Sequence, residues 1–170
     1  ARGLPVLETP VGFKYIVDAM LAGGVLIGGE ESGGIGVARH LPERDGVSNA
    51  LLLLEAQLAA GEGIGATFAR LERELEWPHA YDRLDLKLQG NSLKERVMSA
   101  LETPPDRFGG RRLESLERLD GVKLNLSGQA WLMVRASGTE PVLRLYCEAP
   151  SRAEVQALLE AARTFVEELN

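Results

Sequence analysis

One segment of the sequence combines an arginine, two hydroxyl side chains and a glycine within five residues. Arg135, Ser137, Gly138 and Thr139 lie between two stretches that alternate like β strands, and Pro141 follows them. A guanidinium at a strand end offers a planar fork that matches phosphate oxygens, and glycine lets successive backbone N–H groups curve around an anion. The segment predicts a phosphate-binding loop. An ordinary hairpin turn with a surface arginine would have the same spacing.

A second segment is rich in glycine and acidic side chains. Seven glycines occur among residues 23–36, and Glu30, Glu31 and Ser32 lie between them. Glycine permits close approach of the backbone to a ligand, and carboxylates accept hydrogen bonds from sugar hydroxyls. We therefore expect a site for a polyhydroxylated ligand, with a solvated turn as the alternative. The third glycine of a dinucleotide-binding fingerprint is missing, and no Walker-type lysine follows.

Single residues elsewhere carry less information. Lys14 lies on the polar side of a predicted helix, where most lysines are merely solvated. His40 and His79 have no second histidine or cysteine at the spacing of a zinc site. Cys147 lies in an apolar strand pattern, which predicts a buried, inert thiol. As the single cysteine it excludes an intramolecular disulfide and is typical of a cytoplasmic protein.

The charge distribution narrows the range of partners. The 170 residues carry a net charge of −6, and residues 1–76 hold 11 Asp or Glu against 6 Lys or Arg. Binders of nucleic acid or of anionic membranes more usually carry a basic patch. We therefore expect neither partner, and an anionic ligand must be held by local geometry because the overall field repels it.

The first half of the chain predicts an incomplete α/β domain over residues 1–76. Residues 11–22 have the apolar spacing of a helix, and residues 25–27 predict a short buried strand before the glycine-rich loop. A helix capped by Ser48 or Asn49 is apolar nearly all round, so we expect it to be buried. A second helix then runs to about residue 76. The remaining strands of such a layer are missing.

The second half predicts a small α+β domain over residues 83–170, after a linker at residues 77–82. The expected elements are two helices, with capping boxes at Ser92 and Ser151, and a mostly antiparallel sheet. The expected strands cover residues 83–88, 112–116, 122–126, 131–135 and 142–148.

Together the two loops resemble those of the α-D-phosphohexomutase family, which includes phosphoglucomutases and phosphomannomutases. Residues 29–33 resemble the sugar-binding loop of the third domain of the family, and residues 135–141 resemble the phosphate-binding loop of its fourth domain. The flanking residues 8–14, 42–46 and 142–146 agree as well. The resemblance implies that residues 1–76 are the C-terminal part of the third domain. Residues 83–170 would be the fourth domain.

The resemblance also implies roles for individual residues. Glu30 and Ser32 would contact sugar hydroxyls, and Lys14 would approach the substrate as in some members. Arg135, Ser137, Gly138 and Thr139 would hold the phosphate that is not transferred. Members of the mannose/glucose type often carry histidine where this sequence has Gly34. Glucose phosphates are therefore favoured, and mannose stays possible.

Several parts of the family's machinery are expected to lie outside this sequence. The family transfers phosphate from a phosphoserine and uses Mg²⁺ held by an aspartate-rich loop, and neither motif occurs here. We therefore expect a C-terminal fragment that is inactive alone, with the missing N-terminal domains as its partners. The implied reaction interconverts hexose 1- and 6-phosphates through a hexose bisphosphate intermediate. The implied location is the cytoplasm.

Two other readings stay open. The chain could be a non-catalytic phosphosugar-binding or regulatory module on the same scaffold, because fold and binding loops do not prove turnover. It could also be a nucleotide-binding or interaction domain that uses the glycine-rich loop, although its acidic composition disfavours this.

Overall fold

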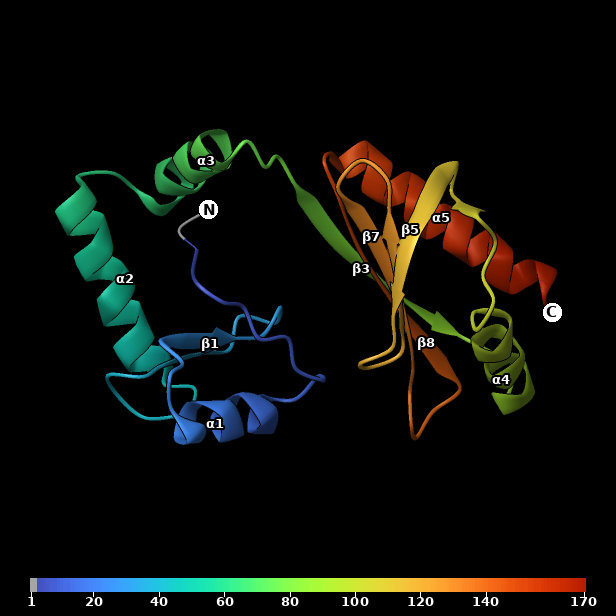
Figure 1. The fold of residues 1–170 in the computed structure, drawn as a ribbon, viewed down its shortest axis with the longest axis horizontal. Coiled ribbons are helices and arrows are strands. Elements are labelled where there is room, and N and C mark those ends of the chain that lie inside the picture. Colours follow the sequence, from blue (N-terminus) through green and yellow to red (C-terminus); the bar gives the residue numbers. More distant parts are fainter. Residues whose placement is uncertain (1–2) are drawn as a thin grey trace. The chain divides into compact units, whose positions relative to one another are not determined.

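The computed structural model describes residues 3–170, and the chain divides into two compact units (Figure 1). Unit 1 is Ala1–Leu75 and unit 2 is Glu76–Asn170. Each unit is described by itself. No helix among the described residues is long and apolar enough to cross a membrane.

Unit 1 is an open α/β arrangement of three helices and one small ribbon, as the sequence predicted for its class. The antiparallel ribbon pairs β1 with β2. The elements in chain order are α1 (Phe13–Ala22), β1 (Ile27–Gly29), β2 (Ile35–Val37), α2 (Gly46–Ala60) and α3 (Ile64–Leu75). The predicted strand at residues 25–27 is therefore misplaced, because the chain pairs two residues later and forms a hairpin with β2.

Helix α1 packs closely on the ribbon because two glycines face each other across it. Gly28 pairs with Gly36. A Cβ at Gly28 would run into the side chain of Ile16, and a Cβ at Gly36 would lie 3.1 Å from the ring of Phe13. Phe13 and Ile16 are accordingly buried. These two glycines thus serve helix packing rather than ligand approach.

The expectation that the helix after the glycine-rich loop is buried is wrong. No residue of α2 is buried, and Leu51 and Leu58 are 63% and 75% exposed. The apolar residues Phe68, Leu71 and Leu75 of α3 are exposed as well. Residues 3–75 form only a two-stranded ribbon, so this described part holds no sheet that could cover a helix apolar on every side.

Helix α2 begins at a different residue from the one predicted. Asp45 is its N-cap, and its carboxylate accepts hydrogen bonds of 3.0 Å from the N–H groups of Val47 and Ser48. These hydrogen bonds, Ser48 first, and one from His40 lower the pKa of Asp45. Asn49, one of the predicted caps, instead donates to the carbonyl oxygen of Ile35 at 2.7 Å and ties α2 to β2.

Unit 2 is an antiparallel sheet with two helices, which confirms the predicted α+β class. The strand order is β3-β8-β7-β6-β5-β4. The strands are β3 (Ala80–Lys87), β4 (Arg107–Phe108), β5 (Arg111–Glu117), β6 (Val122–Leu126), β7 (Ala130–Ala136) and β8 (Val142–Ala149). The helices are α4 (Asn91–Ala100) and α5 (Arg152–Glu168).

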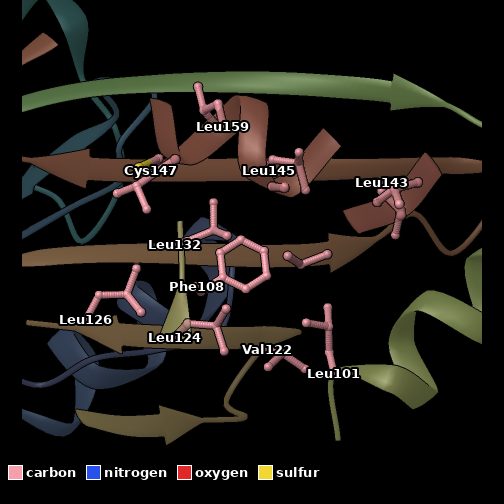
Figure 2. Close-up of a cluster of buried hydrophobic side chains, with 14 of the residues drawn as sticks. Leu101, Phe108, Val122, Leu124, Leu126, Leu132, Leu143, Leu145, Cys147 and Leu159 are labelled. Atoms are coloured by element: carbon pink, nitrogen blue, oxygen red, sulfur yellow. The ribbon is translucent and has the colours of Figure 1, made fainter. Parts of the chain in front are cut away.

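Both helices pack on the same face of the sheet. Alternate strand residues such as Leu132 on β7 and Leu145 on β8 are fully buried, in one cluster with Val97 of α4 and Leu158 of α5. Figure 2 shows part of this cluster, including Leu132 and Leu145, gathered on the strands of the sheet. The intervening residues of each strand therefore lie on the other face, which no helix of unit 2 covers.

The strand and helix limits of unit 2 differ from the predicted limits in a few places. β3 begins at Ala80 rather than at residue 83, because it pairs with β8 over its whole length. α4 begins at Asn91, and its N-cap is Gly90 without a side-chain cap, so the capping box at Ser92 is wrong. The box at Ser151 is confirmed, because Ser151 Oγ accepts from the N–H of Glu154 at 3.3 Å. The strand β4 was not predicted.

Candidate functional site

The residues after β7 form a tight loop that two hydrogen bonds of Ser137 close. The N–H of Ser137 donates to the carbonyl of Val142 at 2.9 Å, and the N–H of Glu140 donates to Ser137 Oγ at 3.3 Å. Ser137 is buried, whereas Gly138, Thr139 and Glu140 are exposed. Among residues 3–170, the N–H groups of Gly138 and Thr139 have no hydrogen-bond partner. The loop therefore presents two adjacent N–H donors to solvent, as an anion nest requires.

Arg135 lies at the end of β7, on the sheet face that the helices leave open. Its Nε donates to Oδ1 of Asp120 at 3.1 Å, and its side chain is 24% exposed. Burial alone would lower the pKa of Arg135, but hydrogen bonds to Asp120 and Tyr146 outweigh it and raise that pKa. The guanidinium is therefore a fixed charge beside the loop.

A glycine explains why Asp120 can reach Arg135. Gly121 has φ +86°, and a Cβ there would run into the carbonyl oxygen of Val134 and lie 3.1 Å from Cα of Arg135. Only glycine lets the two backbones approach this closely. The carboxylate of Asp120, the residue before Gly121, is consequently held against the guanidinium of Arg135.

Arg135 has a second arginine beside it across the sheet. Arg144 on β8 lies directly opposite Arg135, and Asp85 on β3 lies directly opposite Arg144. Asp85 makes two 2.8 Å hydrogen bonds with Arg83, which lower its pKa, and lies 4.0 Å from Nε of Arg144. That Nε is buried and has no hydrogen-bond partner among the residues that the structure describes. Two neighbouring guanidiniums next to the loop favour a doubly charged anion.

The glycine-rich loop forms the tip of the β1–β2 hairpin. The N–H of Glu30 donates to the carbonyl of Gly34 at 2.8 Å, and the N–H of Gly33 donates to the carbonyl of Glu30 at 3.0 Å. Gly33 has φ +91°, a left-handed conformation that favours glycine. Glu31 and Ser32 are exposed at the tip. The loop is thus a defined turn that projects a carboxylate and a hydroxyl.

Arg44 organises this loop and was missed as a site residue by the sequence reasoning. Its guanidinium lies 3.4 Å from the carboxylate of Glu30 and 4.9 Å from the centroid of the Phe13 ring. A Cβ at Gly34 would approach Cδ of Arg44 to 2.7 Å, so glycine makes room for the arginine. The only signal in the sequence was that Arg44 lies within residues 42–46, a flank of the family resemblance.

The predicted site residues form one group in each unit, and Lys14 makes no hydrogen bond or ion pair with the group of its own unit among the described residues. Glu30 and Ser32 share the hairpin tip of unit 1, and Arg135 precedes the loop of Ser137, Gly138 and Thr139 in unit 2. Lys14 is exposed on α1, with its ammonium 4.7 Å from the ring centroid of Tyr15. No hydrogen bond or ion pair joins Lys14 to Glu30 or Ser32 within the described part of the chain. Asp120 and Arg144 were not predicted as site residues. Asp120 lies in no recognisable motif, and Arg144 lies within residues 142–146, a flank of the family resemblance.

Comparison with known families decides the identity of the two units. Residues 1–74 match the family description "Phosphoglucomutase/phosphomannomutase, alpha/beta/alpha domain III". Residues 105–164 match "Phosphoglucomutase/phosphomannomutase, C-terminal domain". The chain belongs to this family. The resemblance inferred from the two loops is therefore confirmed.

Curated relatives of the chain include phosphoglucosamine mutases. A phosphoglucosamine mutase of Moorella thermoacetica is 30% identical over 162 residues, which cover 94% of this chain and 31% of that protein. Another, from Bradyrhizobium sp., is 32% identical over 166 residues, or 97% of this chain and 32% of that protein. The chain thus spans about a third of the length of the curated relatives it matches.

Solved structures of the family agree with the fold. A structure from Thermus thermophilus, provisionally assigned as a phosphomannomutase, is 41% identical with a TM-score of 0.78, over 98% of this chain and 32% of that one. A phosphoglucomutase/phosphomannomutase family protein of Burkholderia thailandensis has a TM-score of 0.70 over 96% of this chain and 32% of that chain. At 19% identity, the second likeness shows the fold alone.

Proposed function

We propose that this chain supplies the sugar-binding and phosphate-binding parts of a phosphohexomutase. The parent enzyme would interconvert hexose 1- and 6-phosphates by phosphotransfer through a hexose bisphosphate intermediate. The observation that carries the proposal is the loop after β7, where the N–H groups of Gly138 and Thr139 have no partner among residues 3–170 and Arg135 lies three residues before Gly138 in the chain. Backbone donors beside an arginine fork suit the oxygens of a phosphate.

Each residue of the phosphate loop has a distinct part in this proposal. Arg135 holds the phosphate that is not transferred through its terminal nitrogens, while Asp120 occupies its Nε. Gly138 and Thr139 donate backbone N–H groups. Ser137 is mainly a loop former, because its Oγ accepts from the N–H of Glu140, and its hydroxyl hydrogen stays available to the ligand.

The hairpin tip of unit 1 is proposed to bind the sugar. The carboxylate of Glu30 accepts from sugar hydroxyls, and the exposed hydroxyl of Ser32 adds a further partner. Lys14 is assigned a looser, electrostatic role because no contact ties it to the loop. Members of the mannose/glucose type often carry histidine at the position of Gly34, and a side chain there would need Arg44 to shift. Glucose phosphates are therefore proposed over mannose phosphates.

A second substrate is favoured by the charge of unit 1. Residues 1–76 carry 11 Asp or Glu against 6 Lys or Arg, and Glu30 and Glu31 lie at the hairpin tip. Carboxylates at this point would favour an ammonium group on the sugar. The curated relatives cited above are phosphoglucosamine mutases. Glucosamine phosphate is therefore the second candidate.

The transfer step itself is assigned to the rest of the parent enzyme. A phosphoserine and Mg²⁺ would act there, where the metal would stabilise charge on the transferring phosphoryl group. No group of three His, Cys, Asp or Glu side chains that could hold a metal gathers among residues 3–170. Because the phosphoserine and aspartate-rich motifs of the family do not occur in this sequence, its residues are given only binding and positioning roles, and the isolated chain should not turn over hexose phosphates. A cytoplasmic location is proposed from the single unpaired thiol of Cys147.

Substitution of Arg135 in the full-length parent tests the proposal. Arg135→Lys keeps the charge but loses the fork, and Arg135→Ala loses both. We expect kcat/KM for the preferred hexose 1-phosphate to fall about 30- to 150-fold in the alanine variant, which corresponds to about 2–3 kcal/mol, and less in the lysine variant. Wild-type kcat/KM in Arg135→Ala would contradict the phosphate site.

The same assay compares substrates and enzyme classes. Rates with the 1-phosphates of glucose, mannose and glucosamine rank the three sugars, and Glu30→Gln should alter this ranking more than it alters phosphate affinity. A parent that binds these sugars but converts none of them would instead be a non-catalytic phosphosugar-binding module.

A further inference from the structure

A lysine from the helix layer reaches the back of the phosphate loop. Lys94, in α4, places its Nζ 3.0 Å from the carbonyl oxygen of Ser137 and 3.4 Å from that of Glu140. The side chain is half-buried, and no carboxylate lies within ion-pair distance of it in the part of the chain that the structure describes. The ammonium of Lys94 thus donates hydrogen bonds to two backbone carbonyls of the same loop.

The contact fixes the direction of a particular peptide group. In a planar trans peptide, the carbonyl of one residue and the N–H of the next point in opposite directions. The ammonium that holds the carbonyl of Ser137 therefore turns the N–H of Gly138 away from α4, on the side where it has no protein partner. A charge-assisted bond to the carbonyl also polarises the peptide, so its N–H becomes a stronger donor to an anion.

The other contacts of the loop do not fix this peptide. The N–H of Ser137 bonds to Val142, and the N–H of Glu140 bonds to Ser137 Oγ, so both close the loop without holding the carbonyl of Ser137. Gly138 has no side chain, and a Cβ there would meet nothing within 4 Å. A flip of the peptide between Ser137 and Gly138 would therefore meet little steric resistance.

We propose that Lys94 is a positioning residue for phosphate, which acts by holding the peptide between Ser137 and Gly138 with its N–H toward the ligand. This inference rests on the proposed function, because it assumes that the loop binds the phosphate of the substrate. It adds a residue that never touches the ligand and that lies 43 residues before the loop in the sequence.

Amide NMR on the ¹⁵N-labelled 170-residue chain, titrated with inorganic phosphate, tests the proposal. In the wild type, the amide proton of Gly138 should shift downfield on binding. Lys94→Met keeps most of the side-chain length without the charge, and should weaken the Kd for phosphate about tenfold and largely remove the Gly138 shift. Lys94→Arg should restore part of both.

Lys87→Met is the matched control. It removes the same charge from the end of β3, where Lys87 lies opposite Val142 beside the loop. Among the described residues, Lys87 donates to no carbonyl of the loop. Its Kd should change less than threefold, and its Gly138 shift should stay. Unchanged amide resonances of α5 verify that each variant is folded. If Lys94→Met is not folded, Lys94→Arg is compared with the wild type instead.

The outcomes separate this inference from the proposed function. Wild-type Kd and a full Gly138 shift in Lys94→Met, or a loss no larger than that of Lys87→Met, would overturn the role of Lys94. If Arg135→Ala loses phosphate in the same titration, the phosphate site still stands. If phosphate moves no amide of residues 137–140 in the wild type, the phosphate site is wrong and the role of Lys94 is wrong with it.

Discussion

The guanidinium of Arg135 is held from one side by Asp120, whose Oδ1 accepts from Nε at 3.1 Å. This bond uses the edge of the guanidinium that is nearest the backbone and leaves the terminal nitrogens for other partners. Both side chains are about three-quarters buried, at 24% and 26% exposure. Asp120 thus orients the fork, but its negative charge also opposes an anion bound nearby. These two effects can be separated by experiment.

Asp120 should respond differently to two substitutions. Asp120→Asn can keep an oxygen acceptor for Nε and removes the negative charge, so phosphate affinity should stay the same or rise. Asp120→Ala frees the guanidinium, and affinity should fall about three- to tenfold, or roughly 1 kcal/mol after allowance for partial exposure. Kd values from phosphate titration decide the point. Equal losses in both variants would show that the charge, not the orientation, matters.

Gly121 should tolerate no side chain. Gly121→Ala combines a strained φ of +86° with a clash against the carbonyl of Val134. We expect the free energy of unfolding to fall by about 3 kcal/mol or more. Gly110→Ala is the control, because it has φ +80° and nothing within 4 Å, and should cost only about 1–2 kcal/mol. Urea denaturation measures both, and similar values for the two variants would refute the clash.

The thiol of Cys147 should be unreactive in the folded chain. Cys147 is fully buried, and this burial raises its pKa to about 12 from an ordinary 9.0. Alkylation by iodoacetamide at pH 8 should be slow until urea unfolds the chain. Rapid native labelling would contradict the buried position.

The same thiol predicts a pH dependence of stability. Above about pH 9 the unfolded thiol loses its proton while the folded thiol keeps it, so the folded state loses stability as pH rises toward 12. The slope from this group is about 1.4 kcal/mol per pH unit. The wild type should therefore lose stability faster than Cys147→Ala over this interval, and parallel curves would be inconsistent with the raised pKa.

The two units should differ in independent stability. Unit 2 has a cluster of 19 buried hydrophobic residues, whereas Phe13 and Ile16 are the buried hydrophobic residues among those described in unit 1. A fragment of residues 76–170 should give a cooperative urea transition, and a fragment of residues 1–75 should not. Limited proteolysis should leave a resistant piece that begins near Trp77, which is exposed. Equal resistance in both units would contradict this expectation.

The elements that depend on local signals were predictable from sequence. The cap at Ser151 rests on a side chain three residues from its partner, and the alternation of Leu132 and Val134 along β7 rests on strand geometry. The family resemblance was predictable because each loop is a contiguous run of residues. Such features depend on neighbours in sequence, so a single chain is enough to find them.

The failures have a different physical origin. Leu51 and its neighbours were expected to be buried because apolar residues need a partner, and that partner is not among the described residues. Asp120 and Lys94 contact residues 15 and 43 positions away, and no spacing rule marks such pairs. Gly28 and Gly36 were predicted to let a ligand approach the backbone. The register of β1 and β2 instead places both glycines against α1.

The pairing of β3 with β8 sets the order in which a nascent chain can complete its sheet. β3 lies at the edge of the sheet, and its eight residues pair with the last strand, from Ala80 opposite Ala149 to Lys87 opposite Val142. On the ribosome, at about 5–20 residues per second, β3 emerges seconds before its only neighbour in the described sheet is translated. The turn that joins β7 to β8 therefore takes its folded shape only after β8 has been translated. Until then, β3 is an unpaired strand edge of the kind that can pair with other chains.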